Sequence, residues 1–408
     1  MIETKGRRLI VMAGLTALLA GLAPACAGDG ARGAGQGRLL IVGGGLSAEN
    51  EAVHRAFVGV LETDARALVL PTASGVPAES GPGAVERLRA HDDAARGISL
   101  LEVTKDDGPL AEDPAVVAAI DDAEGIWFTG GDQARILDVF RPEGRDTAAL
   151  RAMRDLIARD GVIAGTSAGA AMMSDPMIGG GRSREALLVG RAANGDAPGV
   201  EVRPGMGFFP FGIVDQHFLQ RGRFGRLVAA LEAADRRFGF GVSEDAALAV
   251  SLEAGRGRAL GEHALVLIDR VGAQRTGLSR LDLRVSILGD LDVVVLETGE
   301  VEPAPGKRPV GRRGIVEAAG ELEPFGRMGL LRMIERLALD PEQPVRARDE
   351  YFTVVVSADE RTRFLARSAR LDDLCAIGVR LDLVANPGAE AEAARLVAAA
   401  TPSEGGER

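Results

Sequence analysis

A serine between an apolar stretch and a run of small residues is the clearest chemical feature of this chain. Residues 161–164 have the composition of a strand, residues 165–169 read Gly-Thr-Ser-Ala-Gly, and residues 168–173 are compatible with a helix. A tight strand-to-helix turn raises the hydroxyl of Ser167 above the sheet and leaves the amides of a helix N-terminus beside it. This arrangement predicts a serine hydrolase, although the same small residues also suit close packing.

A second glycine-containing segment, residues 128–133, reads Phe-Thr-Gly-Gly-Asp-Gln and also stands where a strand should end and a helix begin. Two glycines let backbone amides approach a ligand closely, so the amides of Gly131 and Ala168 could hold an oxyanion together. A plain tight turn with Asp132 as the helix N-cap explains this segment equally well.

The four histidines leave one leading candidate for a base that takes the serine proton. His54 and His91 lie on stretches typical of amphipathic helices and are expected at the surface, and His263 lies at a strand start. His217 follows an apolar strand, residues 212–214, and has polar neighbours, which favours it as the base. A structural histidine is the alternative at this position.

Residues 239–245 read Gly-Phe-Gly-Val-Ser-Glu-Asp and would bring a carboxylate to the same edge of the sheet. Glu244 or Asp245 could orient the imidazole of His217 and stabilise its cation. The chain order would then be serine, histidine, acid. In α/β-hydrolases the acid precedes the histidine, so that fold is disfavoured.

Three arginines stand near the start of the helix expected over residues 219–238: Arg221, Arg223 and Arg226. Cations in the first turns of a helix oppose its macrodipole, and this placement favours an anionic ligand. Solvated side chains in an arginine-rich protein are the alternative.

Strand and helix patterns alternate through the first part of the chain. Strands are expected at residues 38–42, 67–70, 98–103, 126–129 and 161–164, with helices between them. This alternation predicts an α/β fold with a mostly parallel sheet, helices on both faces, and ligands at the carboxyl ends of the strands. Three glycines, residues 43–45, follow the first strand without the spacing of a dinucleotide-binding fingerprint, so no cofactor is expected.

The amino-acid composition argues against several classes of partner and bound group. The chain has 408 residues, with 48 Lys and Arg against 59 Asp and Glu, which argues against nucleic acid as an obligate partner. Its two cysteines, Cys26 and Cys375, cannot form a disulfide framework, and Cys375 is expected to be a buried small hydrophobe. No histidine–cysteine cluster has zinc spacing, so no metal is expected.

The two ends of the chain predict an export signal and an appendage. Residues 1–25 combine basic residues, a short apolar core and small residues at a cleavage position. Removal of this signal is favoured over anchoring, with lipid attachment at Cys26 as the alternative, so we expect a periplasmic or extracellular protein. Residues 26–37 would form a flexible linker. After residue 300, patterns for a helix and strands predict a small C-terminal α+β appendage over residues 301–408.

Together, the four segments around Ser167, Gly131, His217 and Glu244 resemble the cyanophycinases, which belong to the serine exopeptidase family that includes the peptidase E aspartyl dipeptidases. The similarity extends over about residues 38–300, the expected peptidase domain. It implies a fold like class I glutamine amidotransferases, Ser167 as nucleophile, His217 as general base and acid, and Glu244 as the orienting residue. It also implies a pocket lined by Gln133, Asp215, Gln216, Arg221, Arg223 and Arg226.

The substrate implied by the resemblance is cyanophycin, a poly-aspartate with arginine joined to each side-chain carboxyl. The arginines would bind substrate carboxylates and Asp215 a guanidinium. Ser167 would form an acyl-enzyme and release β-aspartyl-arginine dipeptides from the polymer end. Alternatives are a serine dipeptidase for acidic peptides such as Asp-Xaa and a secreted binding protein without turnover, and a homodimer stays open. Ser243, Ala246 and Leu46 depart from the family pattern.

Overall fold

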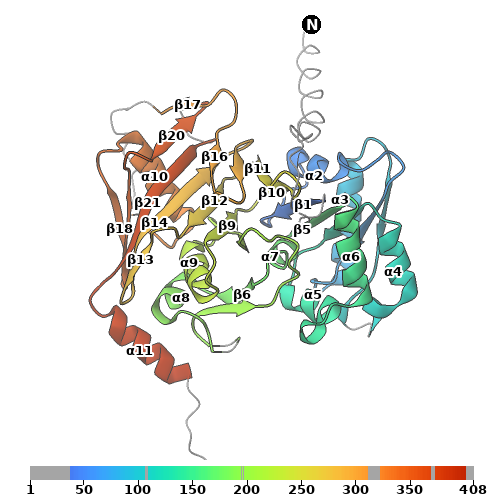
Figure 1. The fold of residues 1–408 in the computed structure, drawn as a ribbon, viewed down its shortest axis with the longest axis horizontal. Helices are drawn as coiled ribbons and strands as arrows, with labels where there is room; N and C mark the ends of the chain where they lie inside the picture. Colours follow the sequence, from blue (N-terminus) through green and yellow to red (C-terminus); the bar gives the residue numbers. More distant parts are fainter. Residues whose placement is uncertain are drawn as a thin grey trace, which may run out of the picture.

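The computed structural model describes residues 37–105, 109–193, 195, 197–310, 322–368 and 373–400. The predicted export signal, Cys26 and residues 26–36 of the predicted linker lie outside these ranges. In the described part of the chain, no helix is both long enough and apolar enough to span a bilayer. Two large sheets with helices packed against them form the body of the molecule (Figure 1).

The first sheet has nine strands in the order β16-β15-β11-β10-β1-β5-β4-β2-β3. Its parallel part consists of β1 (Arg38–Val42), β5 (Val162–Thr166), β4 (Gly125–Phe128), β2 (Arg66–Leu70) and β3 (Gly97–Leu100). Beyond β1 it continues antiparallel through β10 (Ala246–Ser251), β11 (Arg256–Gly261), β15 (Val293–Val295) and β16 (Val301–Glu302). The predicted α/β alternation is confirmed in the parallel half, and the extension makes the whole sheet mixed.

Helices cover both faces of the parallel strands because successive side chains of a strand point to opposite faces. Leu39 and Ile41 of β1 belong to the same core cluster as side chains of α4 (Pro114–Asp121), α5 (Gln133–Phe140) and α6 (Ala148–Ala158). Leu40 and Val42 instead join side chains of α2 (Glu51–Val58) and α3 (Pro77–Ala90). The likeness to class I glutamine amidotransferases stays a prediction.

The second sheet contains strands that precede and strands that follow the domain boundary predicted at residue 300. Its order is β17-β20-β21-β14-β12-β9-β8, with β13 on β14 and the β18–β19 pair on β21. Before the boundary come β8 (Ile213–Gln216), β9 (Phe238–Val242), β12 (Leu265–Asp269), β13 (Gln274–Thr276) and β14 (Ser279–Leu288); after it come β17 (Arg308–Pro309), β18 (Val345–Arg348), β19 (Phe352–Ser357), β20 (Arg363–Ala366) and β21 (Cys375–Ala385). The C-terminal region therefore contains strands, as expected, but these strands complete a sheet that begins in the preceding region.

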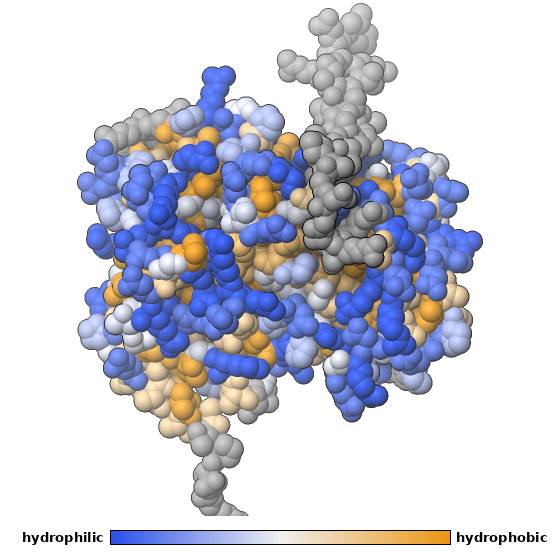
Figure 2. Space-filling view, in the orientation of Figure 1, coloured by the Kyte–Doolittle hydropathy of each residue, from blue (hydrophilic) through white to orange (hydrophobic). Residues whose placement is uncertain are grey.

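Both faces of the second sheet pack against other parts of the protein. Phe238, Phe240 and Val242 of β9 join the core of the first sheet. The opposite face packs against α8 (Ser183–Val189), α9 (Phe224–Ala233) and α10 (Gly329–Leu339). The last helix, α11 (Ala389–Ala400), contacts α8, and Figure 2 shows apolar colour over it.

Short elements connect these layers: α7 (Ala168–Ala171), the β6 (Met177–Gly181) and β7 (Val200–Arg203) hairpin, and 3₁₀ turns at Leu110–Glu112 and Pro142–Gly144. The helix expected over residues 219–238 is shorter than predicted and begins at Phe224. Gly222 has a φ of 55°, outside the right-handed helical region, and so interrupts the expected helix.

Candidate active site

Ser167, His217 and Glu244 meet where the two sheets join. Ser167 follows β5 of the first sheet, whereas His217 and Glu244 follow β8 and β9 of the second. The Oγ atom of Ser167 lies 2.8 Å from Nε2 of His217, and Nδ1 of His217 lies 2.8 Å from Oε1 of Glu244. These contacts form the relay of a nucleophile, a base and an acid that orients the base.

The turn at Ser167 is tight and strained. Ser167 has φ 55° and ψ −106°, a conformation that non-glycine residues rarely adopt and that the surrounding structure must hold in place. Its amide donates to the carbonyl of Val42, and its own carbonyl accepts from Ala170 and Ala171 of α7. A Cβ added to Gly165 would lie 2.3 Å from the carbonyl oxygen of Gly169, so the small residues also serve close packing.

The glycine triplet after β1 holds the other two members of the relay, a role that the sequence analysis missed. The carbonyl of Gly43 accepts from the amide of His217 at 2.7 Å. The carbonyl of Gly44 accepts at 2.9 Å from the amide of Asp245, the residue next to Glu244. A Cβ added to Gly44 would lie 2.3 Å from Cε1 of His217. Three glycines at the carboxyl end of a strand were the available signal, because side chains are excluded where backbone meets a catalytic ring.

Both segments predicted to bind an oxyanion adjoin the nucleophile. Ala168 directly follows Ser167, and a Cβ added to Gly130 would lie 3.3 Å from Cβ of Ser167. Gly131 has φ 147°, and a Cβ there would lie 2.0 Å from the carbonyl oxygen of Ala73. Asp132 also serves as the N-cap of α5, because its Oδ1 accepts from the amide of Ala134 at 2.8 Å.

The environment of His217 favours the neutral imidazole. Burial lowers the pKa of His217 and outweighs the hydrogen bond to Glu244, which raises it; the charges of Arg221 and Arg223 lower this pKa further. A neutral ring at neutral pH can accept the proton of Ser167.

Two of the predicted pocket residues bind each other rather than facing a ligand. Asp215 and Arg226 are 1% and 5% exposed, and Nε of Arg226 donates to Oδ2 of Asp215 at 2.8 Å. A second contact joins the NH2 group of Arg226 to Oδ1 of Asp215, and its NH1 group donates to the carbonyl of Gly181. The expectation that Asp215 offers its carboxylate to a substrate guanidinium therefore needs correction, because this pair connects β8, α9 and β6.

Of the other predicted pocket residues, Gln133, Gln216 and Arg223 have side chains that hydrogen-bond within the protein, whereas the side chain of Arg221 is exposed. The Nε2 group of Gln133 donates to the carbonyls of Ile178 and Gly179 at 3.0 and 2.7 Å. Arg223 donates to the carbonyl and side-chain oxygens of Gln216, and burial lowers the pKa of Arg223 to about 10, so it stays charged at neutral pH. Arg221 has an exposed side chain and is the cation best placed to meet a ligand.

The comparison with protein families agrees with this geometry. A family model described as Peptidase family S51 matches residues 39–256, more than half of the chain, and this span contains the whole relay. The chain belongs to peptidase family S51. It is a serine-type peptidase.

Curated relatives of this S51 peptidase include cyanophycinases. The cyanophycinase of Nostoc sp. (strain PCC 7120 / SAG 25.82 / UTEX 2576) is 32% identical over 238 residues, which cover 57% of this chain and 73% of that protein. The cyanophycinase of Synechococcus elongatus is 30% identical over 247 residues, or 57% and 70% of the two chains. A solved structure of a peptidase from an acI-B1 Actinobacterium aligns with a TM-score of 0.40 and 21% identity, covering 56% of this chain and 89% of that one.

Further residues of the S51 peptidase hold the turn that carries Glu244. The side-chain oxygen of Gln220 accepts from the amide of Glu244 at 2.9 Å, and Nδ2 of Asn50 donates to Oδ1 of Asp245 at 2.8 Å. The hydroxyl of Ser243 and Nε2 of Gln220 are buried without a hydrogen-bond partner among the described residues. The sequence did not reveal these roles of Gln220 and Asn50, because their partners are far away along the chain.

The remaining histidines of the S51 peptidase lie elsewhere. His54 is 1% exposed and stacks on His91, with ring centroids 4.5 Å apart, so the expectation that His54 lies at the surface is wrong. Its ring bonds the carbonyl of Asn50 and packs beside Trp127, an apolar environment that a short helix pattern does not reveal. Within the described ranges, no group of three or more histidine, cysteine or acidic side chains is arranged to hold a metal ion.

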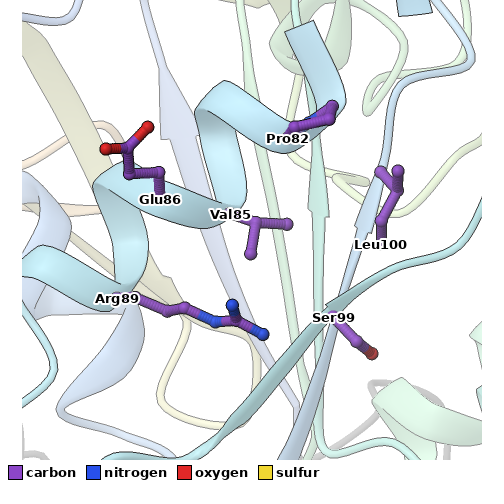
Figure 3. A pocket seen from close by; sticks show the side chains of 6 residues that line it. All are labelled: Pro82, Val85, Glu86, Arg89, Ser99 and Leu100. Carbon is purple, nitrogen blue, oxygen red and sulfur yellow. The ribbon is translucent and has the colours of Figure 1, made fainter. Parts of the chain in front are cut away.

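A cavity of about 420 Å³ lies apart from the relay, between α3 and the edge strand β3 (Figure 3). It is lined by Pro82, Val85, Glu86, Arg89, Ser99 and Leu100. The guanidinium of Arg89 bonds the carbonyl of Ile98, which gives it a structural partner. None of the relay residues lines this cavity, so we do not assign the peptidase chemistry to it.

Proposed function

We propose that this serine peptidase is an exported exopeptidase that releases β-aspartyl-arginine dipeptides from cyanophycin. Relatives that are about a third identical to it are cyanophycinases. The observation that carries the proposal is the relay of Ser167, His217 and Glu244, with both hydrogen bonds at 2.8 Å.

The proposed reaction begins when Ser167 attacks the backbone carbonyl of the substrate. Its proton passes to Nε2 of His217, while Glu244 accepts the hydrogen bond from Nδ1 and stabilises the imidazolium. The amides of Gly131 and Ala168 bind the oxyanion of the tetrahedral intermediate. His217 returns the proton to the leaving amine, and the acyl-enzyme on Ser167 is then hydrolysed by a water molecule that His217 deprotonates.

Recognition in this proposal depends on the turn after His217. Arg221 exposes its guanidinium near the imidazole, and guanidinium groups bind carboxylates in a bidentate manner. The carboxylate of the arginyl or aspartyl end of the substrate is the group that Arg221 would bind.

One observation favours a second function, a dipeptidase for acidic peptides. Asp215 is the only acidic residue among the predicted pocket residues, and Arg226 already neutralises it. The predicted pocket set therefore offers exposed positive charge for an acidic substrate, but no carboxylate for a substrate arginine.

The test is to incubate the purified protein with cyanophycin, and separately with Asp-Xaa dipeptides, and to identify the soluble products by mass. We expect β-aspartyl-arginine from the wild type and none from Ser167→Ala, with an unchanged thermal midpoint for the variant. Hydrolysis of Asp-Xaa alone would assign the second function, and binding of cyanophycin without turnover would make the protein a binding protein. Release by Ser167→Ala at the wild-type rate would overturn the serine mechanism.

Export is proposed from residues 1–25 alone. The mass of the mature N-terminus tests it: cleavage before Cys26 without added mass supports a released protein, and a lipid-modified Cys26 supports an anchored one. An uncleaved chain in the cytoplasm would contradict both.

A further inference from the structure

A segment beyond the family match packs against the turn that carries the active-site arginines. The match ends at residue 256, whereas the segment comprises residues 323–328. The amide of Met328 donates to the carbonyl of Leu219 at 2.7 Å. A Cβ added to Gly222 would lie 2.2 Å from the carbonyl oxygen of Phe325, so the two backbones touch at this point.

Phe325 anchors this segment. Its ring stacks on Phe224, the first residue of α9, with centroids 4.9 Å apart and an interplanar angle of 12°. Phe352 of β19 contacts the same ring edge-on, at 6.3 Å between centroids. The helix α10, which begins just after the segment, buries Leu330 and Met333 in the core of the second sheet. The segment is therefore fixed from one side by packed structure.

The turn on the other side, residues 219–223, carries three groups that act on the site. Arg221 and Arg223 lower the pKa of His217, and Arg223 also bonds Gln216. Gln220 accepts from the amide of Glu244. These residues precede α9, and only a few turn hydrogen bonds hold their backbone, such as those from the amides of Arg221 to His217 and of Arg223 to Phe218. The contact with residues 323–328 supports this turn from outside.

We propose that residues 323–328 are a positioning element of the active site, which sets substrate specificity by holding the arginine turn. This inference rests on the proposed function, since it assigns Arg221 to a substrate carboxylate. A displacement of about 1 Å at a binding cation weakens recognition strongly. Substrates that present a carboxylate to Arg221 should therefore depend on Phe325.

The experiment compares Phe325→Ala with Phe364→Ala in the full chain. Phe364 belongs to the same hydrophobic cluster but lies on β20, which pairs with β17 and β21 and not with the turn. We measure kcat and KM on cyanophycin, the labelling rate of Ser167 by a fluorophosphonate, and amide hydrogen exchange over residues 219–223. Phe325→Leu and Gly222→Ala are second variants in case Phe325→Ala does not fold.

For Phe325→Ala we expect KM to rise about tenfold, with faster exchange over residues 219–223. The values of kcat and of the labelling rate should change less than KM, because Gly43 and Gly44 also hold His217 and the turn of Glu244. Phe325→Leu should show a smaller change in the same direction, and Phe364→Ala should leave KM and this exchange unchanged. An unchanged KM in folded Phe325→Ala, or losses confined to kcat and labelling, would overturn the inference.

The two proposals can fail separately. If the wild type does not degrade cyanophycin, the proposed function fails, and hydrogen exchange alone then decides the inference. Faster exchange over residues 219–223 in Phe325→Ala but not in Phe364→Ala supports the positioning role, and equal exchange in the two variants overturns it.

Discussion

At the scale of single residues, Glu244 acts on the reaction only through the ring of His217. Its Oε1 atom lies 2.8 Å from Nδ1, which fixes the tautomer that leaves Nε2 able to accept a proton. We predict that Glu244→Gln lowers kcat by about 10³- to 10⁴-fold with KM within about twofold, because an amide keeps the shape but removes the charge. Steady-state kinetics on cyanophycin, the proposed substrate, measures both constants.

The control for Glu244→Gln is Glu253→Gln, which changes an exposed glutamate after β10. This variant should keep wild-type kinetics. Equal activity of the two variants would mean that Glu244 does not assist His217.

Arg221 gives the site a testable pH dependence. Its positive charge lowers the pKa of His217, so Arg221→Gln should raise this pKa. His217 must be neutral to act as base, and a higher pKa means that activity disappears at a higher pH on acidification. The acidic limb of the kcat/KM profile should therefore move to higher pH in Arg221→Gln.

Arg221→Lys retains the charge and should leave this limb near its wild-type position, even if substrate binding weakens. Movement of the limb to lower pH in Arg221→Gln would contradict this account. So would equal shifts in both variants.

At the scale of elements, the loop after β1 determines where the ring of His217 can lie. Gly44 has φ 98°, and a Cβ there would lie 2.3 Å from the ring. We predict that Gly44→Ala lowers kcat by at least about 100-fold, because the ring must move away from Ser167. Labelling by a fluorophosphonate together with circular dichroism separates loss of the relay from loss of the fold.

Gly388→Ala is the matched control for Gly44→Ala. Gly388 has a similar φ of 96°, but nothing lies within 4 Å of an added Cβ. This variant carries the backbone strain without the collision and should keep full activity. If both variants lose activity equally, strain rather than collision is the cause.

The features that could be predicted from the sequence are those that depend on neighbouring residues in the chain. The parallel strands followed from local pattern, because apolar runs, glycines and turn residues act on their own segment. The same pattern marked Ser167 and His217 as candidates but left Glu244 and Asp245 open as the acid, and only the resemblance to the cyanophycinases pointed to Glu244. The pairing of Asp215 with Arg226, and the contact of Gln220 with Glu244, did not follow. A polar residue type shows that a partner is needed, whereas the choice between a substrate and a neighbouring side chain depends on tertiary packing.

At the scale of the whole molecule, the relay spans two sheets, so its geometry depends on how they pack. Ser167 belongs to the first sheet, while His217 and Glu244 follow strands of the second. The second sheet is completed only by strands after residue 300, since β14 pairs with β21 from Arg280 to Ile287. The C-terminal region is therefore part of the structure that brings the base to the nucleophile.

We predict that a chain ending at Glu300 does not fold into an active peptidase, whereas a chain ending at Gly388 does. The first cut removes, among others, Phe352, Val354, Leu381 and Leu383, all fully buried in the core of the second sheet. Each contributes about 1.5–3 kcal/mol by burial, and the sum for the four is as large as the 5–15 kcal/mol that typically stabilises a whole domain. The second cut removes α11 and leaves both sheets intact. Thermal unfolding and fluorophosphonate labelling of the two chains check this, and a cooperative, reactive chain ending at Glu300 would show that residues 38–300 fold independently.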